Sequence, residues 1–122
     1  NKRMTPEQRE KATKLLICDY TLLAALPGIE LVQGMPNDLE VNDPGVDKGR
    51  ALRQLADRLG LTADDTMAAG DSGNDLAMLR AAGLAAALRG SAPEVLQAAD
   101  YITTRPCDED GLADALELFW GE

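Results

Sequence analysis

The chain has 122 residues, a net charge of −9 and no histidine, with 45% hydrophobic and 27% charged residues. These values predict one globular domain, or part of a larger one, rather than a disordered segment. The acidic balance argues against a nucleic-acid partner, and the lack of histidine excludes His-based triads and most zinc sites within the chain.

Cysteine use and hydropathy indicate a compartment. Cys18 and Cys107 lie far apart and form no CxxC pair, which favours reduced thiols over a disulfide framework. No apolar stretch is long enough to cross a bilayer, and the polar residues 1–14 are unlike a secretion signal. We therefore expect a cytoplasmic protein with no membrane partner.

The first 42 residues contain several short expected elements. Thr5-Pro6-Glu7-Gln8 predicts the start of a helix that ends near residue 14, with Thr as the N-cap and Pro at the first helical position. The other expected elements are a strand at 15–18, a short helix at 21–26, strands at 29–33 and 39–41, and a loop at 42–46.

Helices and strands alternate regularly from residue 48 onward. Apolar residues within 48–59 form a helical stripe that Gly60 ends. The other expected elements are strands at 66–69, 84–88 and 101–103, and helices at 76–82, 91–99 and 111–119. Ser91 and Glu94 form the capping box expected to open the middle helix. The alternation predicts an α/β fold with a parallel sheet flanked by helices.

The most informative segment is the acidic turn at residues 70–76, Gly-Asp-Ser-Gly-Asn-Asp-Leu. It places Asp71 and Asp75 at the carboxyl end of an expected strand, where open α/β sheets carry their active sites. Two nearby carboxylates repel each other when ionised, and Mg²⁺ would relieve that repulsion. The alternative is a plain turn in which Asn74 and Asp75 cap the next helix.

Lys48 lies in the first turn of an expected helix, where a cation opposes the helix dipole. A bound anion would explain a lysine at this position, because helix N-termini and ammonium groups both attract phosphate. An exposed lysine without a ligand is the alternative. Together with Asp71 and Asp75, Lys48 indicates a site for phosphate and Mg²⁺.

These segments resemble the haloacid dehalogenase (HAD) superfamily, and in particular its Cof-like sugar-phosphate phosphatases. Residues 70–79 are similar to the family's fourth motif, GDxxNDxxML, and residues 45–49 to the segment that carries its third-motif lysine. Residues 98–103 and 108–112 resemble the family's C-terminal segment. The resemblance covers residues 38–119.

The resemblance implies a Mg²⁺-dependent hydrolase of small phosphorylated metabolites. Asp71 would bind Mg²⁺ directly, and Asp75 would support the ion directly or through water. Lys48 would hold the transferring phosphoryl group and the nucleophilic carboxylate. Asn74 would orient the phosphate or metal-bound waters, unless its role is to cap the helix.

The departure from the family concerns the nucleophile, which in members is the first Asp of an N-terminal DxDGT motif. No DxDGT sequence occurs in this chain. Asp19, after the expected strand at 15–18, is one candidate nucleophile. We favour another interpretation, in which residues 1–42 are a remnant of an α+β cap and residues 43–122 are the C-terminal half of a Rossmann-like catalytic core.

A core without its central strand should expose strand edges and apolar faces. We therefore expect self-association or pairing with a missing N-terminal portion, and little hydrolysis by the chain alone. The alternative function is a truncated or degenerate, non-catalytic HAD domain that binds Mg²⁺, phosphate or a protein partner.

Overall fold

The computed structural model describes residues 5–7, 23–32 and 39–121. The chain divides into two compact units, Asn1–Pro44 and Gly45–Glu122, which we describe separately. This boundary falls in the loop expected at 42–46. The assignment of the two parts to a cap remnant and a half-core stays a prediction.

The first unit contains a small antiparallel sheet. Its strands are β1 (Glu30–Val32) and β2 (Glu40–Asn42), paired with Leu31 opposite Val41. Both lie within about one residue of the expected strands. The expected strand at 15–18 and most of the first helix lie outside the described residues. The short helix expected at 21–26 is described only from residue 23, and it gives way to a turn after residue 24.

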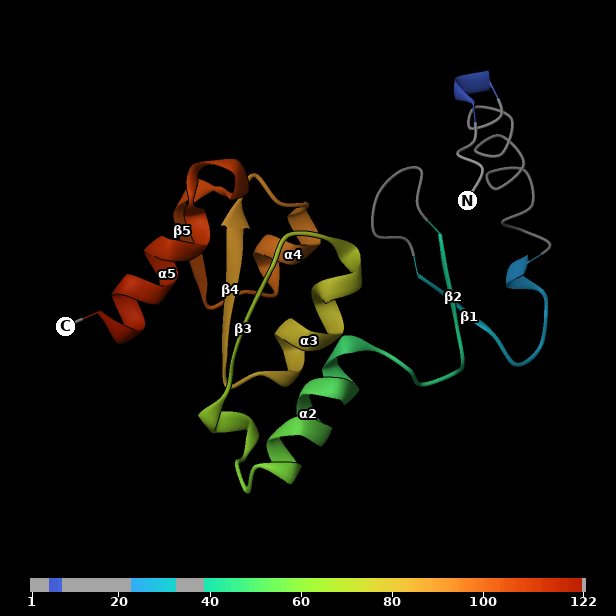
Figure 1. Ribbon diagram of the computed structural model, residues 1–122, viewed down its shortest axis with the longest axis horizontal. Coiled ribbons are helices and arrows are strands. Elements are labelled where there is room, and N and C mark those ends of the chain that lie inside the picture. The colour runs from blue at the N-terminus through green and yellow to red at the C-terminus, as the bar shows by residue number, and fades with distance from the viewer. Residues whose placement is uncertain (1–4, 8–22, 33–38, 122) are drawn as a thin grey trace. The chain divides into compact units, whose positions relative to one another are not determined.

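The second unit is a three-stranded parallel sheet with helices (Figure 1). Its helices are α2 (Lys48–Arg58), α3 (Leu76–Ala81), α4 (Pro93–Gln97) and α5 (Gly111–Trp120). Its strands, β3 (Met67–Gly70), β4 (Leu84–Arg89) and β5 (Tyr101–Pro106), lie in that order across the sheet. Three 3₁₀ turns complete it: η1 (Ala63–Asp65), η2 (Gly73–Asp75) and η3 (Cys107–Glu109). The predicted α/β class is confirmed.

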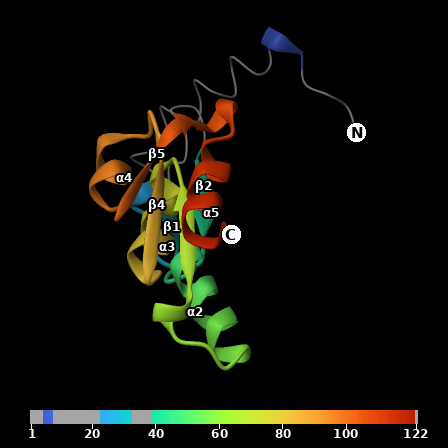
Figure 2. The ribbon, with the colours of Figure 1, turned by 90° about the vertical axis from the view of Figure 1, so that its left-hand side faces the viewer.

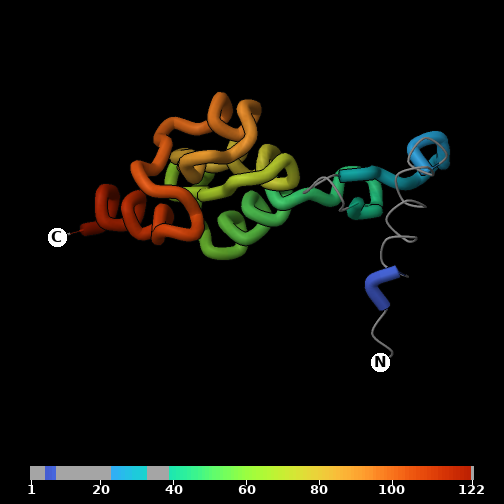
Figure 3. Tube along the Cα trace, turned by 90° about the horizontal axis from the view of Figure 1, so that it is seen from above, coloured from blue at the N-terminus to red at the C-terminus, as the bar shows by residue number. Residues whose placement is uncertain are grey.

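Helices cover both faces of this sheet. Figure 2 shows α4 (orange) and α5 (red) on opposite sides of the strands, and Figure 3 follows the same segments along the chain, seen from above. On one face Ala68, Ala85 and Ala87 pack with Leu79 of α3 and Val95 of α4. Four consecutive residues of β4, 85–88, are buried, as expected for a central strand covered on both sides. Because the strand residues are small, the helices can approach the sheet closely.

Two local expectations were wrong. The strand expected at 101–103 continues to Pro106, which pairs with Arg89 beyond a register shift; an edge strand tolerates polar residues and a terminal proline. The N-cap of α4 is Ala92 rather than Ser91, with Pro93 in the first turn. The Ser91 hydroxyl instead donates to the Leu88 carbonyl at 2.5 Å.

Part of the unit's apolar surface is uncovered. Among the described residues, β3 pairs with β4 on one side and with no strand on the other. Five large apolar side chains of α5 are exposed, namely Leu112, Leu116, Leu118, Phe119 and Trp120. None of the helices in the described ranges has the length and hydrophobicity to traverse a lipid bilayer.

Candidate active site

The acidic turn closes tightly behind β3. Gly70 ends the strand and is buried. A Cβ at Gly70 would lie 2.5 Å from the Cβ of Asp75, closer than real Cβ contacts allow. A glycine is therefore required for Asp75 to fold back against the strand end.

Asp75 is the buried centre of the site, with 6% of the residue exposed. Its Oδ1 accepts a hydrogen bond from Lys48 Nζ at 2.6 Å. Its Oδ2 accepts from the backbone N–H groups of Asp71 and Ser72 at 3.1 and 3.2 Å. Burial acts to raise the pKa of Asp75, but the bonds from Lys48 and the two amides outweigh it and lower the pKa below its ordinary value.

Lys48 reaches Asp75 from the first turn of α2. Asp47 caps this helix, since its carboxylate accepts from the Arg50 N–H at 2.7 Å. Gly49 is buried against α3, and a Cβ there would lie 2.3 Å from the carbonyl oxygen of Ala77. This close approach brings the two helices together and sets the ammonium beside Asp75. The anion that explains a lysine at the helix start is thus, in this structure, the Asp75 carboxylate.

The Lys48 ammonium keeps hydrogen-bonding capacity. The lysine side chain is 48% exposed, compared with 8% for Asp75. An ammonium has three N–H donors, and within the described ranges only Asp75 accepts from Lys48. Two donors therefore remain for a second anion at the same place.

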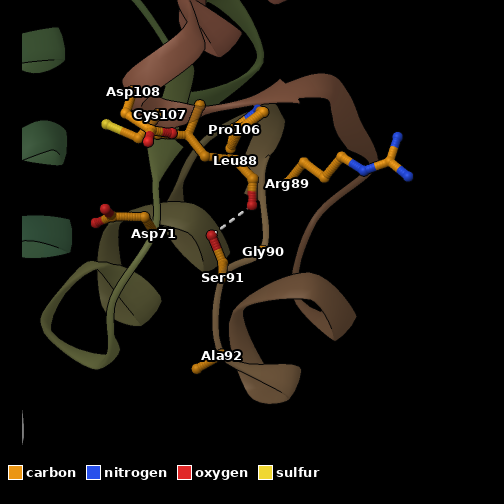
Figure 4. A pocket seen from close by; sticks show the side chains of 9 residues that line it. All are labelled: Asp71, Leu88, Arg89, Gly90, Ser91, Ala92, Pro106, Cys107 and Asp108. Atoms are coloured by element: carbon orange, nitrogen blue, oxygen red, sulfur yellow. Dashed lines mark hydrogen bonds between the residues drawn. The ribbon is translucent and has the colours of Figure 1, made fainter.

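Asp71 is exposed and lies on the wall of a pocket of about 300 Å³ (Figure 4). The ends of β4 and β5 and the segments that follow them supply the other walls, including Ser91 and Asp108. Arg89 also lines the pocket, but its guanidinium points away and donates to the Thr104 carbonyl at 3.1 Å. The pocket therefore stands at the carboxyl edge of the parallel sheet, where such folds bind ligands.

The oxygen donors of this turn suit a hard divalent cation. Asp71 offers an exposed carboxylate. The Ser72 hydroxyl lies within hydrogen-bond distance of both Asp71 Oδ1 and the Asn74 amide oxygen, so these two oxygens are close to the same point. Both oxygens of Asp75 already have partners. In the part of the chain that the structure describes, no three or more histidine, cysteine or acidic side chains are arranged so that together they could hold a metal ion. Mg²⁺ commonly takes one or two carboxylates and completes its shell with water and phosphate, so Asp71 fits that role best.

The structure brings together most of the predicted site residues. Lys48 and Asp75 are in direct contact, and Asp71 adjoins them through the backbone of the turn. Asn74 lies in η2 and does not cap α3, whose N-cap is Asp75 without a side-chain bond. Asp19 lies outside the described residues. The roles assigned to these residues stay predictions.

Two glycines and a serine that shape the site are not among the residues to which the sequence assigns chemistry; for Ser72 it predicts a role in loop geometry. Gly49 and Gly70 permit the close approaches to Ala77 and Asp75. Ser72 contacts three oxygens of the turn. The only sequence feature that could have indicated these residues is their position, because each is adjacent in the chain to Lys48 or Asp71.

Sequence comparison gives two similar relatives. The chain is 41% identical over 88 residues to the 5-amino-6-(5-phospho-D-ribitylamino)uracil phosphatase of Bacillus subtilis (strain 168), covering 72% of this chain and 35% of the relative. It is 40% identical over 83 residues to a phosphoglycolate phosphatase of Methanothermobacter thermautotrophicus (strain Delta H), covering 68% and 37%. The chain thus matches about a third of each relative's length.

Solved structures and a family model also show similarity to phosphatases and related hydrolases. A HAD subclass IIB sugar phosphatase superposes with a TM-score of 0.75 and 33% identity, covering 83% of this chain and 38% of that one. A haloacid dehalogenase-like hydrolase from Bacteroides thetaiotaomicron gives 0.75 and 37%, covering 89% and 41%. The family model described as haloacid dehalogenase-like hydrolase matches residues 4–116. With nearly the whole length matched and the fold in agreement, the chain belongs to the haloacid dehalogenase-like hydrolase family.

Proposed function

We propose that this chain contributes the phosphate- and metal-binding half of a Mg²⁺-dependent phosphatase acting on small phosphorylated metabolites such as sugar phosphates. The observation that carries the proposal is the Lys48–Asp75 pair at 2.6 Å, next to the exposed carboxylate of Asp71 at the end of a parallel strand. One cation and one hard-metal ligand at one edge suit the binding of a phosphoryl group.

The buried and the exposed residues of the site have different proposed roles. Asp75 is held by three donors and fixes the direction of the Lys48 ammonium. The remaining N–H groups of Lys48 would donate to phosphoryl oxygens and, in the complete site, to the attacking carboxylate. Asp71, with Asn74 nearby, would hold Mg²⁺, and Asp75 would support it. The bound ion would neutralise negative charge on the phosphoryl group.

The nucleophile is the part of the mechanism that the recognised motifs do not supply, because the family's DxDGT sequence does not occur in the 122 residues. The family resemblance implies an attacking aspartate and an aspartyl-phosphate intermediate. We propose that this aspartate belongs to a segment outside the 122 residues, with Asp19 as the alternative within them. The chain by itself would then bind phosphate and Mg²⁺ but turn over slowly.

Binding can be tested apart from turnover. Titration calorimetry with inorganic phosphate in the presence of Mg²⁺ should give binding to the wild-type chain and a loss of about tenfold or more in Lys48→Gln. Arg58→Gln, at the other end of α2, is the matched control and should bind as the wild type does. Equal binding by the wild type and Lys48→Gln would refute the assignment of Lys48.

Turnover tests the nucleophile. We expect no p-nitrophenyl phosphate hydrolysis above background by the purified chain with Mg²⁺. Hydrolysis that is lost in Asp19→Asn and kept in Asp43→Asn would show that Asp19 is the nucleophile and that our interpretation of residues 1–42 is wrong.

A second candidate function is a non-catalytic domain that binds a protein partner. The observation that favours it is the exposed apolar face of α5 together with the unpaired edge of β3 among the described residues. Failure of both phosphate and Mg²⁺ to raise the melting temperature would favour this function over the first.

A further inference from the structure

The Ser72 hydroxyl stands at the centre of the acidic turn. Its Oγ lies 3.2 Å from Asp71 Oδ1, 3.0 Å from Asn74 Oδ1 and 3.4 Å from Asp75 Oδ2. The backbone fixes this position, because the Ser72 N–H also donates to Asp75 and Ser72 is the N-cap residue of η2. The hydroxyl therefore faces all three polar side chains of the turn.

One hydroxyl has one proton, so it can donate to only one of these three oxygens at a time. Asp75 Oδ2 already accepts two backbone N–H groups, and the Asn74 oxygen carries no formal charge. Asp71 is a charged acceptor, and within the described parts of the chain its carboxylate accepts only from Ser72. Hydrogen bonds to ionised acceptors are the stronger ones, so the proton stabilises the turn most when it is donated to Asp71.

We propose that Ser72 is a positioning residue for the cation: its hydroxyl holds Oδ1 of Asp71 and so fixes the carboxylate that binds Mg²⁺. The inference rests on the proposed function, because it assigns Ser72 a task within the same site. Groups that hydrogen-bond to metal ligands orient them, and their removal typically weakens metal binding by about 10- to 100-fold.

The competing role for Ser72 is turn formation alone. A residue that only shapes the turn acts through its N–H, which Ser72→Ala retains, and through the capping contact between its side chain and the Asp75 backbone N–H. A role in the turn through Oγ and Asp75 would lower folding stability and leave cation affinity unchanged in the folded protein. The two roles therefore differ in which measurement changes.

The test is a calorimetric titration of the full 122-residue chain with MgCl₂. A second titration uses Mn²⁺, and electron paramagnetic resonance measures how much of this ion is bound. We expect Ser72→Ala to bind either ion about tenfold more weakly than the wild type, and Ser72→Thr, which restores a hydroxyl, to bind within about threefold of it. Thr62→Val is the matched control, because the Thr62 hydroxyl also donates to a carboxylate, Asp65 Oδ2 at 2.9 Å, but at the 3₁₀ turn η1 and not in the pocket. Urea unfolding of each variant reports the folded fraction.

The outcomes separate the two proposals. If the wild type binds the cation and folded Ser72→Ala binds it equally well, the inference about Ser72 is wrong while the proposed metal site stands. If the wild type binds no better than Asp71→Asn, both the metal site and the inference fall. If Ser72→Thr is as weak as Ser72→Ala, the hydroxyl is not the group that acts, and the inference is again wrong.

Discussion

The Lys48–Asp75 and Arg105–Asp114 ion pairs lie in the same unit and are similarly exposed. The basic side chains are 48% and 44% exposed, and the carboxylates 8% and 11%. Each joins a helix to a strand end or a neighbouring turn. Exposure alone therefore does not distinguish a candidate active site from a structural contact.

The pairs differ in the geometry of the cation. Arg105 presents Nε and Nη2 to the same oxygen of Asp114, and its backbone N–H and the Thr104 hydroxyl contact the other oxygen. This fork has one rigid arrangement, which fastens α5 to β5. Lys48 makes one bond from a rotatable ammonium. A lysine can therefore accept a second anion without losing the first, and an arginine fork that already holds a carboxylate is less free to do so.

The largest expected change in stability concerns the close contact between α2 and α3 at Gly49, which brings Lys48 to Asp75. An added methyl group in Gly49→Ala would meet the Ala77 carbonyl oxygen at 2.3 Å. We expect the free energy of unfolding to fall by about 1–3 kcal/mol, although Gly→Ala in an open helix is stabilising. Urea unfolding measures the change. Ala51→Gly, on the exposed side of α2, is the control and should cost about 1 kcal/mol through helix propensity. A stabilised Gly49→Ala would show that α2 and α3 are not held as closely as the structure has them.

Removal of one member of each pair sharpens the comparison. Lys48→Met leaves the buried Asp75 carboxylate with only two backbone donors, so we expect a loss of about 1–2 kcal/mol in unfolding free energy. It should also abolish phosphate binding. Arg105→Met should lower the urea midpoint but leave phosphate binding intact. Loss of phosphate binding in both variants would mean that the two pairs do not differ in function.

Acid should weaken the arginine pair in a defined range. The Arg105 and Thr104 hydrogen bonds lower the pKa of Asp114 from 3.8 to about 2. A carboxylate whose pKa is lower in the folded state stabilises the fold above its unfolded pKa, and this contribution is lost as pH falls through the folded pKa. We expect the wild-type urea midpoint to fall between about pH 4 and pH 2, and the slope to be smaller in Asp114→Asn. Asp75, whose pKa is also lowered, should maintain part of the slope. Equal slopes in the two proteins would contradict the assignment to Asp114.

The smallest change in stability is expected for Asp71→Asn. Asp71 is exposed and in no ion pair among the described residues, so the unfolding free energy should change by no more than about 0.5 kcal/mol. The rise in melting temperature on adding MgCl₂ should nevertheless disappear. A variant that retains this rise would place the cation elsewhere.

Local patterns predicted most of the second unit. The helical stripe at 48–59 and its glycine stop correspond to α2, and the strand at 84–88 corresponds to β4 with one residue added. These features depend on neighbouring residues, because periodicity and caps act over one or two turns. The prediction failed at Ser91, whose hydroxyl donates to the nearby Leu88 carbonyl and does not accept from a backbone N–H at the start of α4.

The sequence by itself determined that a lysine and two aspartates stand at strand and helix ends, and from this pattern a phosphate and Mg²⁺ site is predicted. Only the tertiary structure decided that Lys48 meets Asp75, 27 residues away, while Asp71 stays exposed. This arrangement depends on two close contacts, that of Gly49 with the Ala77 carbonyl and that of Gly70 with the Asp75 side chain. Such contacts depend on how helices pack against each other and against the sheet, and no local pattern encodes that distance.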